Sequence, residues 1–469
     1  MTLDIDQMNV QRARAAVETC QRFHFMGVGG VGMSALARWL ARRGKLVSGC
    51  DRSDGERLEF LRREGIPTHT GHDVSHLREA DCLVYTTAIK PTNAEFLAAR
   101  ERGLVTLHRA ELLAAIATSR KGLAVTGTHG KSTTTALVGT ILEAAGLDPL
   151  VFVGGDAPQW GGNVRFGDGE WCVFEACESD GTIVLYEHCS QVLTSLEPDH
   201  LDQYGTFDNL QAFMRRFAAS AAEEGFLVYC ADSEAAAGVA EAAPCRRVSY
   251  GLQAGEYRAV NIRPRQGGGT AFSMLSPTGR RDVRLRLYGP HNVANALAAV
   301  AAATQVGVEE DLAVEALATF PGIGRRFECL GTFGASIVLD DYAHHPTEVA
   351  AVLRTAREYL DRPIVAIFQP HLYSRTRDFM DDFARAFADA DEVVFTEIYP
   401  AREEPIPGVT GEELARRAAA VRPDRPTHYV PTLPEVTDFV RHRYRQGWAV
   451  IVMGAGDVRK VAEALVKEP

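Results

Sequence analysis

The stretch Gly127-Thr128-His129-Gly130-Lys131-Ser132-Thr133 decides the fold of this chain. An apolar run at 122–126 precedes it and is typical of a buried strand, whereas the apolar spacing of 134–145 predicts a helix. A strand, a glycine-rich turn and a helix N-terminus form a cradle in which backbone N–H groups and the helix dipole attract an anion. We therefore expect a phosphate-binding loop.

Lys131 is the expected phosphate contact of this loop, and the Ser132 hydroxyl is the expected Mg²⁺ ligand. Of the 50 lysines and arginines in the chain only six are lysines, and one of them stands where a compact point charge suits a phosphate. We expect Lys131 to face solvent when no ligand is bound. A glycine-rich turn with an exposed lysine and no ligand is the alternative.

Composition narrows the class of protein. A length of 469 residues suggests about three domains, at roughly 100–200 residues per domain. The net charge of −11 argues against a nucleic-acid-binding surface. The chain has no apolar run of the ~18 residues that a membrane span needs, and its N-terminus does not resemble a signal sequence. Nine scattered cysteines without a C-x-x-C pair indicate reduced thiols, and hence a cytoplasmic protein without membrane insertion.

Three glycine-rich strand–turn–helix signals recur, at 27–34, 127–133 and 454–457. They predict an α/β fold with three α/β domains whose sheets are parallel and doubly wound. We place the domains at 1–118, 119–325 and 326–469. The first is Rossmann-like, the second contains the phosphate loop, and the third is again Rossmann-like.

The N-terminal signal is a G-x-G-x-x-G pattern formed by Gly27, Gly29 and Gly32. Asp51 follows at the end of the next predicted strand, 19 residues after the last glycine. This arrangement is typical of a dinucleotide or nucleotide-sugar site. Tight helix–strand packing without a ligand is the alternative.

Two acidic segments follow predicted strands of the central domain, at 174–180 and 196–202. Ligands bind at the carboxyl ends of strands in α/β sheets, and a phosphate-bound Mg²⁺ takes one or two protein carboxylates. Glu175 is therefore the first choice for this metal, with a solvated acidic loop as the alternative. His200, flanked by acids, is a candidate ligand of a second metal.

Three further segments carry polar side chains next to predicted elements. Residues 288–295 open an alanine-rich helix, where His and Asn could cap the helix or contact a purine edge. Arg325 and Arg326 stand at the predicted junction of the second and third domains, where they could contact a γ-phosphate. Residues 339–347 end one strand, and 369–377 follow another.

From about residue 22 to the C-terminus, these segments resemble the Mur ligases in order and spacing. The resemblance rests on the segments G-V-G-G-V-G-M-S, T-G-T-H-G-K-S-T-T-T, E-A-C-E-S-D, E-P-D-H-L-D, G-P-H-N-V-A-N-A-L-A, G-R-R-F-E, D-D-Y-A-H-H-P-T-E, Q-P-H-L-Y-S-R-T and Y-P-A-R-E-E-P-I-P-G-V. It implies an N-terminal UDP-sugar-binding domain, a central P-loop ATPase domain and a C-terminal ligase domain.

The resemblance also implies a reaction. ATP would phosphorylate the lactyl carboxylate of UDP-N-acetylmuramate, and the amine of L-alanine would attack the acyl phosphate to give an amide, ADP and phosphate. Catalysis would be mostly positioning and charge neutralisation. ATP and two Mg²⁺ ions, which Mn²⁺ can replace, are the implied cofactors, and the protein is expected to be a monomer or weak homodimer.

The residue roles implied by the resemblance form four groups. The catalytic residues are Lys131, His200, His344 and Arg375, the last pairing with the amino acid's carboxylate. The metal ligands are Ser132, Glu175 and His200. ATP contacts are Gly127, Thr128, His129, Gly130, Lys131, Ser132, Thr133, Asn292, Asn295, Arg326 and Asp341. UDP-sugar contacts are Gly27, Gly29, Gly30, Val31, Gly32, Met33, Ser34, Asp51, Thr86 and Thr87.

Several positions depart from the family pattern. The family usually has Thr at Ser132, Asp at Cys177, Asn at Ser195 and Ala at Pro198. Some members carry a carbamylated lysine at the position of Met214, whereas this chain has no lysine between Lys131 and Lys460. We therefore expect activity that does not depend on dissolved CO₂.

Three other functions stay open. The Rossmann-like start would also suit an NAD(P)-dependent nucleotide-sugar oxidoreductase, which would leave the phosphate loop unexplained. Cys177 and Ser195 would also suit a non-catalytic relative that senses a nucleotide sugar. Within the family, a recycling ligase that adds a preformed tripeptide is the remaining alternative.

Overall fold

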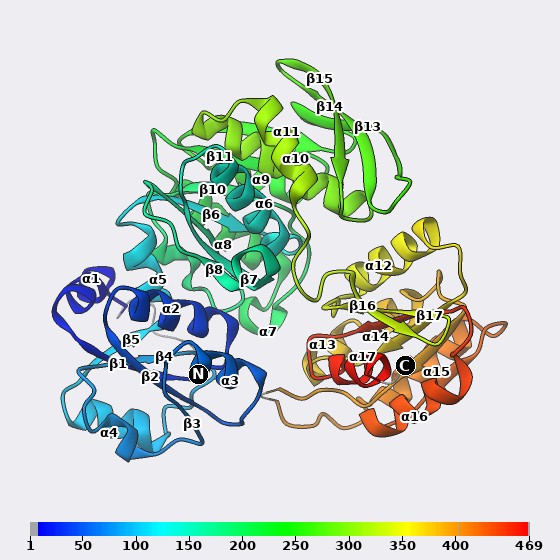
Figure 1. Ribbon diagram of the computed structural model, residues 1–469, viewed down its shortest axis with the longest axis horizontal. Coiled ribbons are helices and arrows are strands. Elements are labelled where there is room, and N and C mark those ends of the chain that lie inside the picture. The colour runs from blue at the N-terminus through cyan, green and yellow to red at the C-terminus, as the bar shows by residue number, and fades with distance from the viewer. Residues whose placement is uncertain (1–7, 402, 468–469) are drawn as a thin grey trace. The chain divides into compact units, whose positions relative to one another are not determined.

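The structure, a computed structural model, describes residues 8–401 and 403–467. Three sheets with helices packed on them make up this part of the chain (Figure 1). By compactness the chain divides into two units. The first comprises 1–261, 272–283 and 294–321, and the second comprises 262–271, 284–293 and 322–469. The boundaries expected at 118/119 and 325/326 stay predictions.

The first sheet has the strand order β3-β2-β1-β4-β5, and all its pairs are parallel. This is the doubly wound arrangement predicted from the G-x-G-x-x-G pattern. Its elements are α1 (Val10–Thr19), β1 (Arg22–Met26), α2 (Val31–Arg42), β2 (Leu46–Asp51), α3 (Glu56–Arg63), β3 (Thr68–Thr70), η2 (Val74–Leu77), β4 (Cys82–Tyr85), α4 (Ala94–Glu101), β5 (Val105–His108) and α5 (Arg109–Ala117).

The second sheet has ten strands in the order β15-β14-β13-β12-β11-β10-β6-β9-β7-β8. The strands around the phosphate loop are parallel, but β7 and β8 pair antiparallel. Its elements are β6 (Lys121–Thr126), α6 (Lys131–Ala144), β7 (Leu150–Ala157), η3 (Pro158–Trp160), β8 (Gly162–Arg165), β9 (Trp171–Glu175), η4 (Thr182–Leu185), β10 (Ser190–Leu193), α7 (Leu201–Tyr204), α8 (Phe207–Ala219), β11 (Phe226–Cys230), α9 (Glu234–Ala240), β12 (Arg246–Gly251), β13 (Tyr257–Pro264), β14 (Thr270–Ser276), β15 (Gly279–Leu285), α10 (Pro290–Val306) and α11 (Glu310–Thr319).

The third sheet has the order β16-β17-β21-β18-β19-β20, with one antiparallel pair, β16–β17, at its edge. The predicted α/β class is therefore confirmed, whereas the expectation of parallel sheets throughout is wrong for the second and third sheets. The elements are β16 (Glu328–Phe333), β17 (Ser336–Asp341), α12 (Pro346–Tyr359), β18 (Ile364–Phe368), α13 (Tyr373–Asp378), α14 (Met380–Arg385), β19 (Glu392–Phe395), α15 (Gly411–Val421), β20 (Thr427–Tyr429), α16 (Leu433–Arg443), β21 (Ala449–Met453) and α17 (Arg459–Val466).

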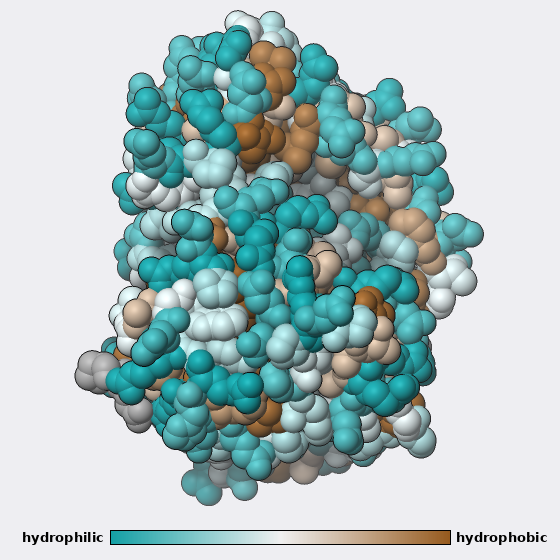
Figure 2. All heavy atoms as spheres, turned by 90° about the vertical axis from the view of Figure 1, so that its right-hand side faces the viewer, coloured by the Kyte–Doolittle hydropathy of each residue, from teal (hydrophilic) through white to brown (hydrophobic). Residues whose placement is uncertain are grey.

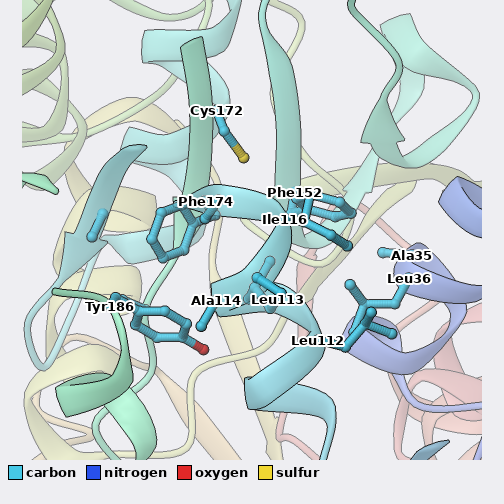
Figure 3. Packing of buried hydrophobic residues seen from close by; sticks show 14 of the residues in the cluster. Ala35, Leu36, Leu112, Leu113, Ala114, Ile116, Phe152, Cys172, Phe174 and Tyr186 are labelled. Carbon is cyan, nitrogen blue, oxygen red and sulfur yellow. The ribbon is translucent and has the colours of Figure 1, made fainter. Parts of the chain in front are cut away.

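Within the first unit, the first and second sheets share one hydrophobic core. Leu36 of α2 and Leu112 and Ile116 of α5 belong to the same buried cluster as Phe152 of β7 and Phe174 of β9 (Figure 3). All five side chains are at most 5% exposed. The helices of the first sheet therefore cover part of the second sheet, which places the glycine turn and the phosphate loop in one folding unit.

One face of the molecule is mainly polar (Figure 2). Hydrophilic residues dominate the face drawn in Figure 2, and apolar residues lie in small separate groups on it. Among the residues that the structure describes, no helix has the length and apolarity needed to cross a membrane.

Candidate active site

The phosphate loop connects β6 to α6 and is held by the segment that follows β10. Gly127 and Gly130 have φ values of +122° and +82°, which favour glycine, and Gly130 caps α6. The Thr128 N–H donates to the Ser195 carbonyl at 2.9 Å, and the His129 N–H donates to Ser195 Oγ at 3.1 Å. Although the family pattern has Asn at 195, the serine hydroxyl still anchors the loop.

Lys131 is the first residue of α6, and its side chain folds back over the loop. Its Nζ donates to the Gly127 carbonyl at 2.6 Å and to Glu178 Oε1 at 3.1 Å. The side chain is only 12% exposed, so the expectation that Lys131 faces solvent is wrong. Burial acts to lower the pKa of Lys131, but Glu178 and other neighbouring anionic groups outweigh burial and raise it, so the ammonium stays charged.

Ser132 and Glu175 meet beside the loop. Ser132 Oγ donates to Glu175 Oε2 at 2.5 Å, and the Gly154 N–H donates to the same oxygen at 3.2 Å. Glu175 is the last residue of β9, where the strand ends beside the N-terminus of α6. A hydroxyl and a carboxylate next to a phosphate cradle are the oxygen donors that Mg²⁺ prefers, so this pair fits the predicted metal.

His200 lies beside the same acidic segment, in a left-handed conformation with φ +53°. Its Nε2 is 3.8 Å from Glu178 Oε1 and 3.6 Å from Asp199 Oδ2. Glu178, which is 2% exposed, therefore lies between Lys131 and His200. The acidic run at 175–180 indicated that a carboxylate of this segment lies at the site. Sequence spacing alone did not show that Glu178, and not only Glu175, is such a carboxylate.

Cys177, where the family pattern has Asp, lies in the same acidic segment. Its Sγ donates to Ser179 Oγ at 3.1 Å. Burial raises the pKa of the Cys177 thiol, and nearby Glu178 raises it further, so a neutral thiol replaces the family carboxylate. Position 177 therefore adds no negative charge to this acidic segment.

The two asparagines of α10 have different surroundings. Asn295 Oδ1 accepts a hydrogen bond from Thr134 Oγ1 at 3.3 Å, and a Cβ on Gly130 would overlap the same oxygen. Asn292 Nδ2 donates to the Tyr288 carbonyl at 2.8 Å. Asn295 thus packs directly against the phosphate loop, which the sequence did not reveal.

Asp341 ends β17 in the second unit. Its two oxygens accept hydrogen bonds from the N–H groups of Phe327 and Ala343, each at 2.7 Å. Burial raises the pKa of Asp341 to about 6, although Arg326 and these two N–H groups act to lower it. Arg326 also lies over the Tyr342 ring, 5.3 Å from its centroid.

His344 and Arg375 both lie close to His371. The rings of His344 and His371 are 6.0 Å apart, and Arg375 Nη1 is 3.5 Å from His371 Nδ1. Arg375 is 7% exposed although it carries a charge. The structure thus brings two predicted catalytic residues together around a histidine to which the sequence assigned no role.

The N-terminal glycine turn joins β1 to α2. The Gly29 N–H donates to Asp51 Oδ2 at 2.9 Å, and the Gly27 N–H donates to the Cys50 carbonyl at 2.8 Å. Asp51 therefore supports the turn directly. The remaining predicted contacts surround it, with Gly30 capping α2, Val31 and Gly32 in its first turn, and Thr86 and Thr87 following β4.

Two predicted UDP-sugar contacts point into the protein. Ser34 is fully buried, and its hydroxyl donates to the Val31 carbonyl at 2.9 Å and accepts from Asn163 Nδ2 at 2.9 Å. Met33 is 3% exposed. Asn163 of β8 thereby ties α2 to the second sheet, a structural role that the sequence did not indicate.

The three sheets with their helices, together with the loop between β6 and α6 that carries Lys131, define an α/β protein with a phosphate-binding cradle. Family models match nearly the whole chain in three consecutive parts. The Mur ligase family catalytic domain matches 22–121, the Mur ligase middle domain 125–303, and the glutamate ligase domain of Mur ligases 325–456. The chain belongs to the Mur ligase family.

Relatives that match along nearly their full length support membership of the Mur ligase family. The UDP-N-acetylmuramate–L-alanine ligase of Chelativorans sp. (strain BNC1) is 40% identical and covers 95% of this chain and 97% of the relative. That of Symbiobacterium thermophilum is 42% identical, with 95% and 94% covered. The crystal structure of UDP-N-acetylmuramate-alanine ligase from Thermotoga maritima has a TM-score of 0.83 at 28% identity, covering 95% and 98%. A murein peptide ligase from Psychrobacter arcticus shares the fold, with a TM-score of 0.73 at 24% identity and coverage of 95% and 98%.

Proposed function

We propose that this protein is an ATP-dependent ligase that joins L-alanine to the lactyl carboxylate of UDP-N-acetylmuramate in peptidoglycan synthesis, releasing ADP and phosphate. The observation that carries the proposal is the match of 40–42% identity along nearly the full length of UDP-N-acetylmuramate–L-alanine ligases. The Mur ligase family uses ATP. A cytoplasmic location and a monomer or weak homodimer complete the proposal.

The first chemical step is phosphoryl transfer from ATP to the carboxylate. Lys131 is held as an ammonium at the loop by Glu178 and by loop carbonyls, so its charge is in position before the phosphates bind. In this step a carboxylate oxygen attacks the γ-phosphorus, the bond to the β-phosphate oxygen breaks, and ADP leaves. Fixed positive charge lowers the barrier because the transition state carries negative charge on the oxygens of the transferring group and on the leaving ADP.

Ser132 and Glu175 would hold one Mg²⁺, and His200 would contribute to a second. When bound, these ions would neutralise phosphate charge, and Mn²⁺ could replace them. Ser132 and Glu175 already lie in contact and offer only oxygen atoms, which supports their assignment to Mg²⁺. A second ion would have one nitrogen donor from His200 and no carbamylated lysine, so substrate oxygens and water would complete its coordination.

The second step is attack of the L-alanine amine on the acyl phosphate. The C–N bond forms, the C–O bond to phosphate breaks, and phosphate leaves with the bonding electrons, while the amine nitrogen loses a proton to the phosphate or to water. We assign Arg375 to the carboxylate of alanine and His344 to the vicinity of its amine. Burial of Arg375 supports this role, because a largely desolvated guanidinium pairs strongly with a carboxylate.

The remaining assignments are also proposals. Asn292, Asn295, Arg326 and Asp341 would contact the nucleotide. The turn from Gly27 to Val31 and Asp51 would hold the UDP end, since a glycine turn at a helix N-terminus suits a pyrophosphate. The domains would be 1–118 for the UDP-sugar, 119–325 for ATP and 326–469 for the amino acid.

A phosphate-release assay tests the proposal. The purified full chain is incubated with ATP, Mg²⁺ and UDP-N-acetylmuramate, and L-alanine, glycine, L-serine or an L-alanyl tripeptide is added in turn. We expect phosphate release that requires the UDP-sugar and is fastest with L-alanine. A preference for the tripeptide would instead assign the chain to peptide recycling. Oxidation or reduction of a nicotinamide cofactor without phosphate release would contradict ligase activity.

A further inference from the structure

A cluster of metal-ligating side chains to which no role has been assigned lies among the elements of the first sheet, next to the N-terminal glycine turn. It consists of His24 on β1, Cys50 on β2, His76 on η2 and Glu95 on α4. These four positions span 72 residues without a recognisable metal-binding spacing, so the sequence did not indicate them. The fold brings together two imidazoles, a thiol and a carboxylate.

The donor atoms are close enough for one ion. Each residue offers an atom that lies within 4.8 Å of the other three. Glu95 Oε1 is 3.0 Å from His24 Nε2 and 3.4 Å from His76 Nδ1, and Cys50 Sγ is 3.4 Å from Glu95 Oε2. Bond lengths of ~2.0–2.3 Å in tetrahedral zinc sites place ligand atoms about 3.3–3.8 Å apart. Small side-chain rotations would therefore suffice.

Burial makes this cluster costly without a cation. His24 and Cys50 are fully buried and Glu95 is 1% exposed. His24 Nε2 and His76 Nδ1 are buried nitrogens that both lie close to the same buried carboxylate oxygen, Glu95 Oε1. Two imidazoles, a thiol and a carboxylate thus converge within 4.8 Å of one another in a buried place, and a cation among them would offset the cost of burying the carboxylate.

The surroundings are those of a supported metal site. His24 Nδ1 lies 2.8 Å from Ser48 Oγ, a contact that would fix the ring while Nε2 binds a metal. His76 stacks on His69 with ring centroids 4.4 Å apart. His72 Nδ1 is 3.2 Å from Cys50 Sγ and offers a further nitrogen at the rim.

We propose that His24, Cys50, His76 and Glu95 bind a structural Zn²⁺ ion in the N-terminal domain. Thiolate and imidazole donors favour Zn²⁺ over Mg²⁺ or Ca²⁺, which prefer oxygen. Binding replaces the thiol proton of Cys50 with a metal–sulfur bond and releases that proton. The ion would brace the end of β2, where the Cys50 carbonyl accepts the N–H groups of Gly27 and Val28.

Metal content and Co²⁺ spectra of the full chain test the site. The protein is treated with a chelator, loaded with Zn²⁺ or Co²⁺, passed over a desalting column and analysed by mass spectrometry for metal. We expect about one equivalent of tightly held metal per chain. The Co²⁺ form should show a thiolate-to-metal charge-transfer band in the near ultraviolet and tetrahedral bands in the visible region.

Variants separate this site from others. Cys50→Ser should abolish the charge-transfer band, and His76→Gln should weaken metal affinity at least ~10-fold. Their controls are Cys82→Ser, which removes a buried thiol on β4, two strands from β2 in the same sheet, and His69→Gln, which removes the ring stacked on His76. Both variants should keep the band. If Cys50→Ser fails to fold by circular dichroism, the less buried ligand variant His76→Gln decides. Absence of retained metal, metal without a thiolate band, or a band that survives Cys50→Ser would overturn the proposal.

Discussion

Lys131 has a catalytic and a structural role that substitutions would separate. Lys131→Ala should lower kcat by about 10²–10³, since a fixed charge at the phosphates is lost. It should also lower the free energy of unfolding by up to about 3–5 kcal/mol, because it leaves the buried Glu178 carboxylate without its cation. Steady-state rates at saturating ATP and urea unfolding measure the two effects.

A second substitution and a surface lysine provide the controls. Lys131→Ala/Glu178→Gln should recover stability without recovering rate. Lys121→Ala, which removes a 60% exposed lysine paired with Glu170, should change neither. A rate loss below about tenfold for Lys131→Ala would remove the phosphate contact from the proposal.

Arg375 is predicted to select the amino acid. Arg375→Ala should raise KM for L-alanine roughly 10–100-fold, because the variant loses a hydrogen bond to a charged group. KM for ATP should stay nearly unchanged. Arg377→Ala is the matched control, because Arg377 lies two residues away, is 54% exposed and pairs with Asp378. Equal changes of both KM values would indicate a structural arginine or a nucleotide contact instead.

Residue types could be predicted here, but their pairings could not. The run at 127–133 identified Lys131 and Ser132 because glycine, lysine and hydroxyl groups in that order suit a phosphate. The contacts of Lys131 with Glu178 and of Gly130 with Asn295 join positions 47 and 165 residues apart. Only the strand order brings these positions together, so no local pattern encodes them.

The helix α6 allows a comparison of two glycines at its ends. Gly130 has φ +82° and a Cβ there would overlap Asn295 Oδ1, whereas Gly146 has φ +72° and open space around it. Both alanine variants should lose about 1–2 kcal/mol of stability to left-handed strain. Gly130→Ala should lose more and should also raise KM for ATP at least tenfold, roughly the effect of one lost loop contact. Equal KM values in the two variants would contradict the assigned role of the loop.

The end of β17 should respond to pH through Asp341. Its pKa is raised from 3.8 to about 6, so the folded state favours the protonated carboxyl. The raised pKa therefore contributes up to about 3 kcal/mol to the free energy of unfolding. This contribution is fully present below pH 3.8 and is lost as the pH rises through 6. Asp341→Asn lacks this titration. The stability of the wild type relative to this variant should therefore fall between pH 4 and 7, as followed by thermal unfolding. A constant difference would show that Asp341 does not titrate there.

Elements with a strong apolar run were predictable from sequence. The strands at 171–175, 364–368, 392–395 and 449–453 each consist largely of apolar residues. The α6 helix instead begins at Lys131, three residues before its apolar spacing starts, because the glycine at 130 caps it. The antiparallel pairs β7–β8 and β16–β17 were missed, since apolar alternation does not encode the direction in which a neighbouring strand runs.

At the scale of the whole molecule, the class and number of sheets followed from three glycine-rich turns. The hydrophobic core shared by the first two sheets could not be predicted from the sequence. Leu112 and Ile116 have the sequence pattern of core residues of the first domain, and only the fold brings them into one cluster with Phe152 and Phe174. A fragment ending at 118 would expose this face. Binding of the UDP-sugar is therefore best measured on the full chain.

The central claim is that the lactyl carboxylate of UDP-N-acetylmuramate is activated by ATP before it reacts with L-alanine. Substrate with ¹⁸O in that carboxylate, ATP and L-alanine are incubated with the full chain, and the phosphate released is analysed by mass spectrometry. An acyl phosphate transfers one carboxylate oxygen to phosphate, so each phosphate formed with product should carry one ¹⁸O. Phosphate free of ¹⁸O, alongside amide product, would contradict this mechanism.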